Sequence, residues 1–220
     1  MEHWRPAEIE RASMEIIDRE LTARGVRLPA DTAPVVKRVI HATADFDYGE
    51  NLQFTPDAVA RGVNALLAGT SVVTDTNMAL SGVSAPGLQK LGGGKYCYMA
   101  DPEVAEMAKA RGVTRAVISV ERAAAERPGC IYAVGNAPTA LFELIRQMEQ
   151  GFRPALIVGV PVGFVNVVEA KEALWEACLS QEIPAIVAMG RKGGSAVAAA
   201  ILNALIYRAA GMLEPESRGW

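Results

Sequence analysis

Three continuous apolar runs constrain the fold of this chain more than any other feature of its sequence. They contain five or six residues each and lie at 130–134, 155–160 and 184–189. Such short, uninterrupted runs are typical of strands that are buried on both faces. Segments of helical composition separate them, at 139–150 and 169–179. This alternation predicts an α/β fold, with a mostly parallel sheet flanked by helices on both faces.

The other expected elements follow from apolar periodicity and from residues that begin or end helices. Thr55 is expected to cap a helix at 56–67. A further helix at 195–210 is rich in alanine. No linker or repeat divides the 220 residues, so we expect a single domain over 1–220. The remaining helices are expected at 9–23, 32–44, 102–110 and 114–126, and the remaining strands at 71–74 and 95–99.

Composition and charge exclude several functional classes. The formal net charge is -3, so no excess of basic residues favours nucleic acid as a partner. No apolar stretch is long enough to span a membrane, and residues 1–6 lack the apolar core of a signal peptide. The three cysteines are far apart and form no C-x-x-C pair, which argues against a disulfide framework or a thiolate zinc site. We therefore expect a cytoplasmic protein without a metal site of its own.

Polar loops follow four of the expected strands, at 74–77, 135–139, 161–164 and 190–195. The carboxyl ends of parallel strands meet at one edge of a sheet, where ligands commonly bind. Thr76, Asn136, Arg191 and Lys192 are the candidate binding residues in these loops, and the last two add positive charge for an anionic ligand. The alternative is purely structural, because glycine and asparagine also serve turn geometry and Ser195 can cap a helix.

His41 is the candidate for acid–base chemistry. The only other histidine, His3, lies close to the N-terminus. Arg38 precedes His41 by three residues on one helical face, and Asp45 follows it by four, where a carboxylate could orient the imidazole if the helix continues. An imidazole titrating near neutrality can donate or accept a proton. A purely structural histidine is the alternative.

Long segments of the chain resemble the signature sequences of the precorrin-8X methylmutases, also called precorrin isomerases. The resemblance runs in the same order from Ser13 to Tyr207. It departs locally at 166–168, where Asn-Val-Val replaces the usual Gly-Ala-Ala. The matching segments are KRVIHATADFD at 37–47, TDTNMALSG at 74–82, GNAPTAL at 135–141, GVPVGFV at 159–165 and GRKGGS at 190–195.

The resemblance implies an isomerase of cobalamin biosynthesis that moves a methyl group from C11 to C12 of a corrin precursor. The substrate would be precorrin-8X or cobalt-precorrin-8, and the product hydrogenobyrinate or cobyrinate. Segments 43–47 and 190–195 resemble the cobalt branch more closely. No cofactor is implied, since any cobalt arrives inside the substrate. The resemblance also implies a homodimer with active sites at or near the subunit interface.

The same resemblance assigns roles to individual residues. The histidine that matches His41 is the proton donor and acceptor in the family. Substrate contacts carry over to Ser13 and Arg38, with Arg115 as a further contact. A corrin precursor carries many carboxylates, so Arg38, Arg115, Arg191 and Lys192 would complement its charge.

Two alternatives remain from the sequence. One is a non-catalytic corrinoid carrier, which would bind the product and transfer it to the next enzyme. The other is an isomerase or lyase that acts on a small molecule of another pathway. Turnover distinguishes the carrier from the methylmutase, and a comparison of carboxylate-rich tetrapyrroles with small sugar or keto acids distinguishes the other enzyme.

Overall fold

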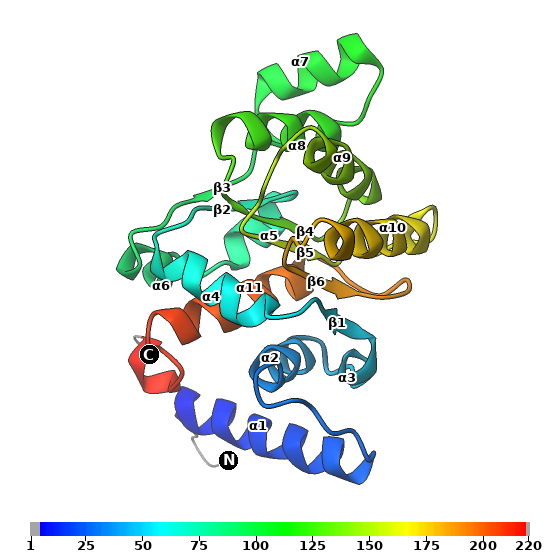
Figure 1. Cartoon of the computed structure of the whole chain (residues 1–220). Coiled ribbons are helices and arrows are strands. Elements are labelled where there is room, and N and C mark those ends of the chain that lie inside the picture. Colours follow the sequence, from blue (N-terminus) through cyan, green and yellow to red (C-terminus); the bar gives the residue numbers. More distant parts are fainter. Residues whose placement is uncertain (1–4, 219–220) are drawn as a thin grey trace.

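A computed structural model describes residues 5–218, and its strands form one six-stranded sheet (Figure 1). The order is β1-β6-β5-β4-β2-β3. β1 runs antiparallel to β6, and every other neighbouring pair is parallel, which confirms the predicted α/β fold. The strands are β1 (Leu52–Phe54), β2 (Val72–Thr74), β3 (Lys95–Tyr96), β4 (Ile131–Val134), β5 (Leu156–Gly159) and β6 (Ala185–Ala188). His3 and most of the segment 1–6 lie outside the described residues.

Helices cover both faces of the sheet, as predicted. One face carries α7 (Pro102–Arg111), α8 (Arg115–Glu126), α9 (Pro138–Glu149) and α10 (Val167–Ser180). The other face carries α2 (Ala33–Thr43), α4 (Ala58–Leu67), α5 (Asn77–Gly82), α6 (Ala85–Lys90) and α11 (Ser195–Ala209). In Figure 1, α1 (Pro6–Ala23) lies outside α2, beside the C-terminal 3-10 helix η1 (Pro215–Arg218), and the short α3 (Tyr48–Asn51) precedes β1.

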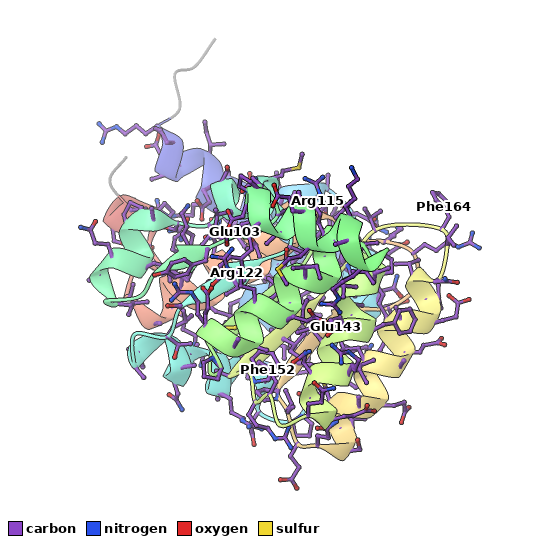
Figure 2. All side chains as sticks on the ribbon, turned by 90° about the horizontal axis from the view of Figure 1, so that it is seen from above. Glu103, Arg115, Arg122, Glu143, Phe152 and Phe164 are labelled. Carbon is purple, nitrogen blue, oxygen red and sulfur yellow. The ribbon has the colours of Figure 1, made fainter. Side chains whose placement is uncertain are left out.

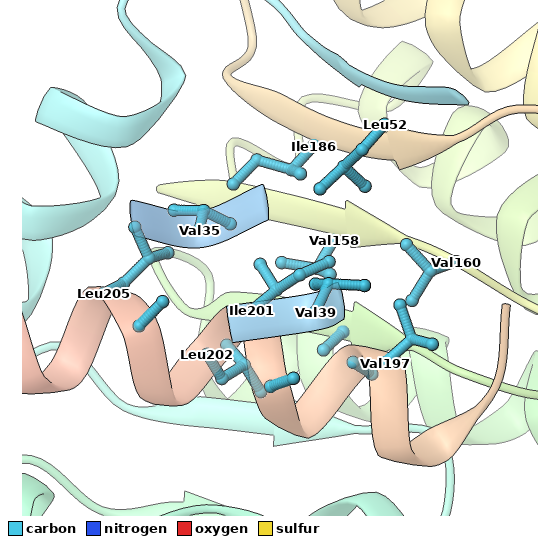
Figure 3. Packing of buried hydrophobic residues seen from close by; sticks show 14 of the residues in the cluster. Val35, Val39, Leu52, Val158, Val160, Ile186, Val197, Ile201, Leu202 and Leu205 are labelled. Carbon is cyan, nitrogen blue, oxygen red and sulfur yellow. The ribbon is translucent and has the colours of Figure 1, made fainter. Parts of the chain in front are cut away.

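The central strands are apolar throughout because both of their faces are buried. Along β4, Ile131 and Ala133 pack on the face of α2 and α11, whereas Tyr132 and Val134 pack on the face of α8 and α9. Figure 3 shows the first of these two cores, where side chains of α2 and α11 meet those of β5 and β6. Burying one such aliphatic side chain contributes about 1.5–3 kcal/mol to folding.

Two local predictions were wrong. Thr55 does not cap a helix: its hydroxyl accepts a hydrogen bond from the Ala185 amide at 2.8 Å, because Thr55 continues the pairing of β1 with β6. Helix α4 begins only at Ala58, after Asp57 adopts a left-handed φ of 58°. The strand expected at 95–99 is only two residues long, and Tyr98 leaves the sheet to pack against α8.

The topology brings the predicted polar loops to one edge of the sheet. β2, β4, β5 and β6 are parallel, so their carboxyl ends lie together. The helix that follows β2 packs on one face of the sheet, and the helix that follows β4 packs on the other. The neighbouring strands β2 and β4 therefore flank a topological switch point, the place where open α/β sheets usually bind ligands.

Candidate active site

A buried carboxylate occupies the switch point between β2 and β4. Asp75 is fully buried, and its two carboxylate oxygens accept hydrogen bonds from the amides of Gly135, Asn136 and Ala137 at 2.8–2.9 Å. Burial raises the pKa of Asp75, while these three amide donors oppose the rise. The backbone amides after β4 are thus already engaged by the protein and are not available to a ligand.

A buried lysine binds the backbone of the loop after β6. Lys171 of α10 is fully buried, and its ammonium donates hydrogen bonds to the carbonyls of Gly190 and Lys192, both at 2.8 Å. Burial lowers the pKa of Lys171 to about 8. Gly193 packs so closely on the loop after β5 that a Cβ there would lie 2.1 Å from the Val160 carbonyl oxygen. These contacts fix the backbone that carries Arg191 and Lys192.

The loop after β6 also contacts the segment that follows His41. The Lys192 ammonium lies 2.6 Å from a carboxylate oxygen of Asp45 and 2.6 Å from one of Asp47. The expectation that Asp45 orients His41 was wrong, because α2 ends at Thr43, before Asp45, and the Asp45 carboxylate pairs with Lys192. This pair lowers the pKa of Asp45. The C-terminal end of α2 is thereby joined to the carboxyl edge of the sheet.

His41 lies in the last turn of α2, with an exposed side chain. Desolvation by the surrounding protein lowers its pKa, and the positive charges of Arg38 and Arg218 lower it further. The negative charge of Glu10 acts in the opposite direction. The imidazole therefore combines an exposed side chain with a pKa that is lowered first by desolvation and then modified by three neighbouring charges.

Arg38 projects from α2 toward α1 and forms an ion pair with Glu10 at 2.7 Å. Arg218 of η1 binds the same carboxylate at 2.5 Å and 2.7 Å. Both guanidinium groups lie near the ring of Tyr207, at 5.5 Å and 4.3 Å from its centroid. A cavity of about 430 Å³ borders Arg38 and Glu10, between α1, α2 and the C-terminal segment.

The other predicted contacts fall into two groups. Ser13 lies one turn after Glu10 on α1, so it belongs to the same part of the molecule as Arg38; its hydroxyl donates to the Ile9 carbonyl. Arg115 begins α8, on the opposite face of the sheet from α2, and donates to the Met99 carbonyl at 3.1 Å. The fold therefore places these predicted contacts in different helical layers.

Thr76 and Asn136 are both at the carboxyl edge, as predicted. The Thr76 hydroxyl caps α5 and lies 2.8 Å from the Ser195 hydroxyl, so it already serves the structure. The Asn136 side chain is exposed. Arg191 is also exposed, lies over the ring of Phe164 and forms no ion pair within residues 5–218. Asn136 and Arg191 are thus the two loop candidates whose side chains reach solvent without a strong partner.

Apolar side chains are exposed along the same edge. Phe164 and Val165 are 81% and 78% exposed, and Met78 is 74% exposed. Figure 2 shows Phe164 at the margin of the molecule, on the same side as Arg115 and away from Phe152. A surface that mixes exposed apolar groups with arginine suits a ligand that is both apolar and anionic.

Sequence reasoning missed several residues that shape this site. The burial of Lys171 could have been predicted from the sequence, because Lys171 lies in the apolar stripe of α10 formed by Val167, Ala170, Leu174 and Cys178. The pairing of Glu10 with Arg218 could not have been predicted, because 208 positions of sequence separate the two residues.

Within residues 5–218, no group of three or more His, Cys, Asp or Glu side chains is arranged to hold a metal ion. No helix in this part of the chain is long and apolar enough to cross a membrane.

The fold and site define an α/β protein with one solvent-accessible histidine beside arginines, next to an apolar edge of the sheet. The family model described as precorrin-8X methylmutase (CbiC) matches residues 8–208. The chain therefore belongs to the precorrin-8X methylmutase family. It is a methylmutase, which is an intramolecular transferase of the isomerase class.

Individual relatives support this assignment. The chain is 43% identical over 201 residues to a cobalt-precorrin-8 methylmutase of Priestia megaterium, which covers 91% of this chain and 87% of the relative. It is 39% identical over 201 residues to a precorrin-8X methylmutase of Pseudomonas aeruginosa, covering 90% and 93%. Among solved structures, the precorrin-8X methylmutase of Thermus thermophilus is similar, with a TM-score of 0.82, 43% identity and coverage of 92% and 98%.

Proposed function

We propose that this protein converts cobalt-precorrin-8 or precorrin-8X by moving a methyl group from C11 to C12 of the macrocycle, with His41 as proton donor and acceptor. The exposed imidazole beside the Arg38–Glu10–Arg218 group is the observation that carries this proposal. Sequence similarity to cobalt-precorrin-8 methylmutases favours the cobalt-containing substrate.

The proposed reaction requires the protein to orient the substrate and to supply a proton. The migrating methyl group stays within one bound molecule, so the reaction needs no second substrate. In this proposal Arg38 and Arg191 bind carboxylates at the rim of the macrocycle. The contact of Arg191 with the Phe164 ring supports it, because it puts apolar surface beside a cation. Any cobalt belongs to the substrate.

The charges around His41 predict how the reaction depends on pH. The pKa of the imidazole is lowered from 6.5 in the free protein, so its protonated form predominates only below that lowered value. If protonated His41 starts the rearrangement, kcat/KM falls as the pH rises through this pKa. A bound substrate brings carboxylates near the ring and raises the pKa, so kcat falls at higher pH than kcat/KM does.

We further propose a homodimer whose interface includes the apolar side chains at the carboxyl edge. Phe164 and Val165 are adjacent, apolar and largely exposed. Exposed apolar groups that lie together are typical of surfaces that contact another molecule. A partner at this edge would also bring a second set of charged residues, such as Arg115, to the site. Sedimentation velocity tests this point, and a monomer at micromolar concentration contradicts it. A cytoplasmic location remains a prediction from the sequence.

The direct test is the visible absorption spectrum of each substrate, mixed anaerobically with catalytic amounts of wild-type protein or His41→Ala. We expect the wild type to convert one or both substrates and His41→Ala to lose at least about 100-fold in rate, since general acid–base catalysis contributes about 10²–10⁴-fold. An undiminished rate in the variant refutes the role of His41. Stoichiometric binding without turnover would instead support the carrier.

A further inference from the structure

Glu10 is a mostly buried carboxylate that two arginines share unequally. Its side chain is 14% exposed, while those of Arg38 and Arg218 are 17% and 5% exposed. Arg38 makes one hydrogen bond, to a single carboxylate oxygen, at 2.7 Å. Arg218 binds both oxygens, at 2.5 Å and 2.7 Å, so it is the more deeply buried and more fully engaged partner.

Arg218 is also fixed to its own segment, whereas Arg38 borders open space. The Arg218 guanidinium donates to the carbonyls of Met212 and Leu213, and it lies 4.3 Å from the centroid of the Tyr207 ring. Arg38 instead lines the cavity of about 430 Å³ between α1 and α2. Arg38 can therefore turn from Glu10 into this open space and lose only its contact with the Tyr207 ring, whereas Arg218 would also lose its bonds to two backbone carbonyls.

This asymmetry decides whether Arg38 is available to a ligand. A buried carboxylate that loses its only cation is strongly destabilised. With Arg38 as the sole partner of Glu10, any substrate carboxylate would have to break that ion pair and leave Glu10 unpaired. With Arg218 in place, Glu10 keeps two charge-assisted hydrogen bonds when Arg38 leaves.

We propose that Glu10 and Arg218 are positioning residues that keep Arg38 exchangeable: Arg38 rests on Glu10 in the free protein and moves to a substrate carboxylate, while Arg218 stays on Glu10. The C-terminal helix η1 thereby belongs to the substrate-binding apparatus, although it lies outside the segments that resemble the family. The proposal rests on the proposed function, because it assumes that Arg38 binds a carboxylate of the corrinoid.

The test is a double-mutant cycle with cobalt-precorrin-8, measured at a pH where kcat is constant. Arg218→Met leaves Glu10 dependent on Arg38, so KM rises about tenfold or more while kcat changes less than about twofold. Glu10→Gln removes the competing charge and does not raise KM. In the double variant Arg218 is no longer needed, and KM returns to within about threefold of the wild-type value.

Glu216→Gln is the matched control. It removes another ion pair between α1 and the C-terminal segment, Arg11 with Glu216, but that pair is exposed and does not involve Glu10. Its KM stays at the wild-type value. An unchanged KM in Arg218→Met overturns the proposal. A double variant as impaired as Arg218→Met overturns it too, because Arg218 would then act only by holding the segment in place. If Arg218→Met does not fold, Arg218→Gln, which removes the charge but can still donate a hydrogen bond, replaces it in the cycle.

A second measurement needs no substrate and separates this proposal from the proposed function. Glu10, Arg38 and Arg218 are the charged groups that act on His41, and the chain has only one other histidine. An NMR titration in a His3→Gln background therefore reports the pKa of His41. Arg218→Met raises this pKa and Glu10→Gln lowers it, whether or not the protein turns over a corrinoid. An unchanged pKa in both variants overturns the arrangement.

Discussion

Replacing Lys171 with methionine tests how the fold accommodates a buried cation. The ammonium has three N–H donors, but the described part of the chain offers it two acceptors, the carbonyls of Gly190 and Lys192. A neutral amine has two N–H donors, which are enough for both carbonyls. Losing the proton thus removes a buried charge without losing a hydrogen bond, which explains why the pKa falls to about 8.

The magnitude follows from the size of this shift. The pKa moves from 10.5 to about 8, and each unit corresponds to about 1.36 kcal/mol. Between these two pH values the unfolded chain retains the proton that folded Lys171 has lost, so rising pH favours the folded wild type through this group. The variant lacks this contribution. The difference in unfolding free energy, wild type minus Lys171→Met, is therefore expected to increase by about 3 kcal/mol as the pH rises across this range.

The assay is urea unfolding of both proteins at pH values from about 7 to about 10.5, with the difference in unfolding free energy plotted against pH. Cysteines and tyrosines titrate in both proteins and cancel in the difference. Lys95→Met is the matched control, because the Lys95 ammonium also donates to two carbonyls, of Leu80 and Val83, but is only half-buried. A difference for Lys171→Met that does not change with pH refutes the reasoning.

Three further substitutions have expected outcomes. Asp75→Asn keeps the size of the side chain but places an amide donor against at least one of the three backbone N–H groups, whichever way the amide is oriented. We expect a loss of about 2–4 kcal/mol in urea unfolding, and a loss below about 0.5 kcal/mol contradicts the bonding pattern. Gly193→Ala brings a Cβ against the Val160 carbonyl, so we expect a displaced loop and at least tenfold lower kcat/KM, with wild-type kinetics as the contrary result. Lys192→Met removes the main cause of the lowered pKa of Asp45, so we expect an NMR titration to show this pKa rising, and an unchanged value contradicts the ion pair. In the wild type the pair stabilises the fold above the unfolded pKa of Asp45, and this contribution disappears as the pH falls through the folded pKa.

The sequence predicted the sheet because its central strands are buried on both faces and therefore read as unbroken apolar runs. The edges of the sheet were less predictable. β1 pairs with one neighbour only and has the mixed sequence Leu-Gln-Phe. Three residues are too few for periodicity to distinguish a strand from a loop. At 166–168, Asn166 adopts a φ of 56°, which asparagine tolerates, so the departure from the family pattern is accommodated locally.

The site was predictable only where its chemistry is local in the sequence. His41 and Arg38 are three residues apart on one helix, and their proximity follows from helical geometry. The partners of Asp45 and Glu10 could not be predicted, because Lys192 and Arg218 come close to them only through the complete fold. Lys171 within the apolar stripe of α10 was an indication of a special role, because an unpaired lysine is rarely buried.

The carboxylate of Asp75 also bears on which metabolites compete for this protein. An open switch point in a parallel sheet is a narrow slot lined by amide donors, and it suits the phosphates of elongated nucleotides, which are abundant in cells. Here the carboxyl group of Asp75 already accepts hydrogen bonds from the amides after β4, so these amides are not available to a phosphate group. A broad, flat ligand that lies across the ends of several strands is unaffected by that closure. The closed switch point therefore disfavours nucleotides as competitors of the proposed macrocyclic substrate.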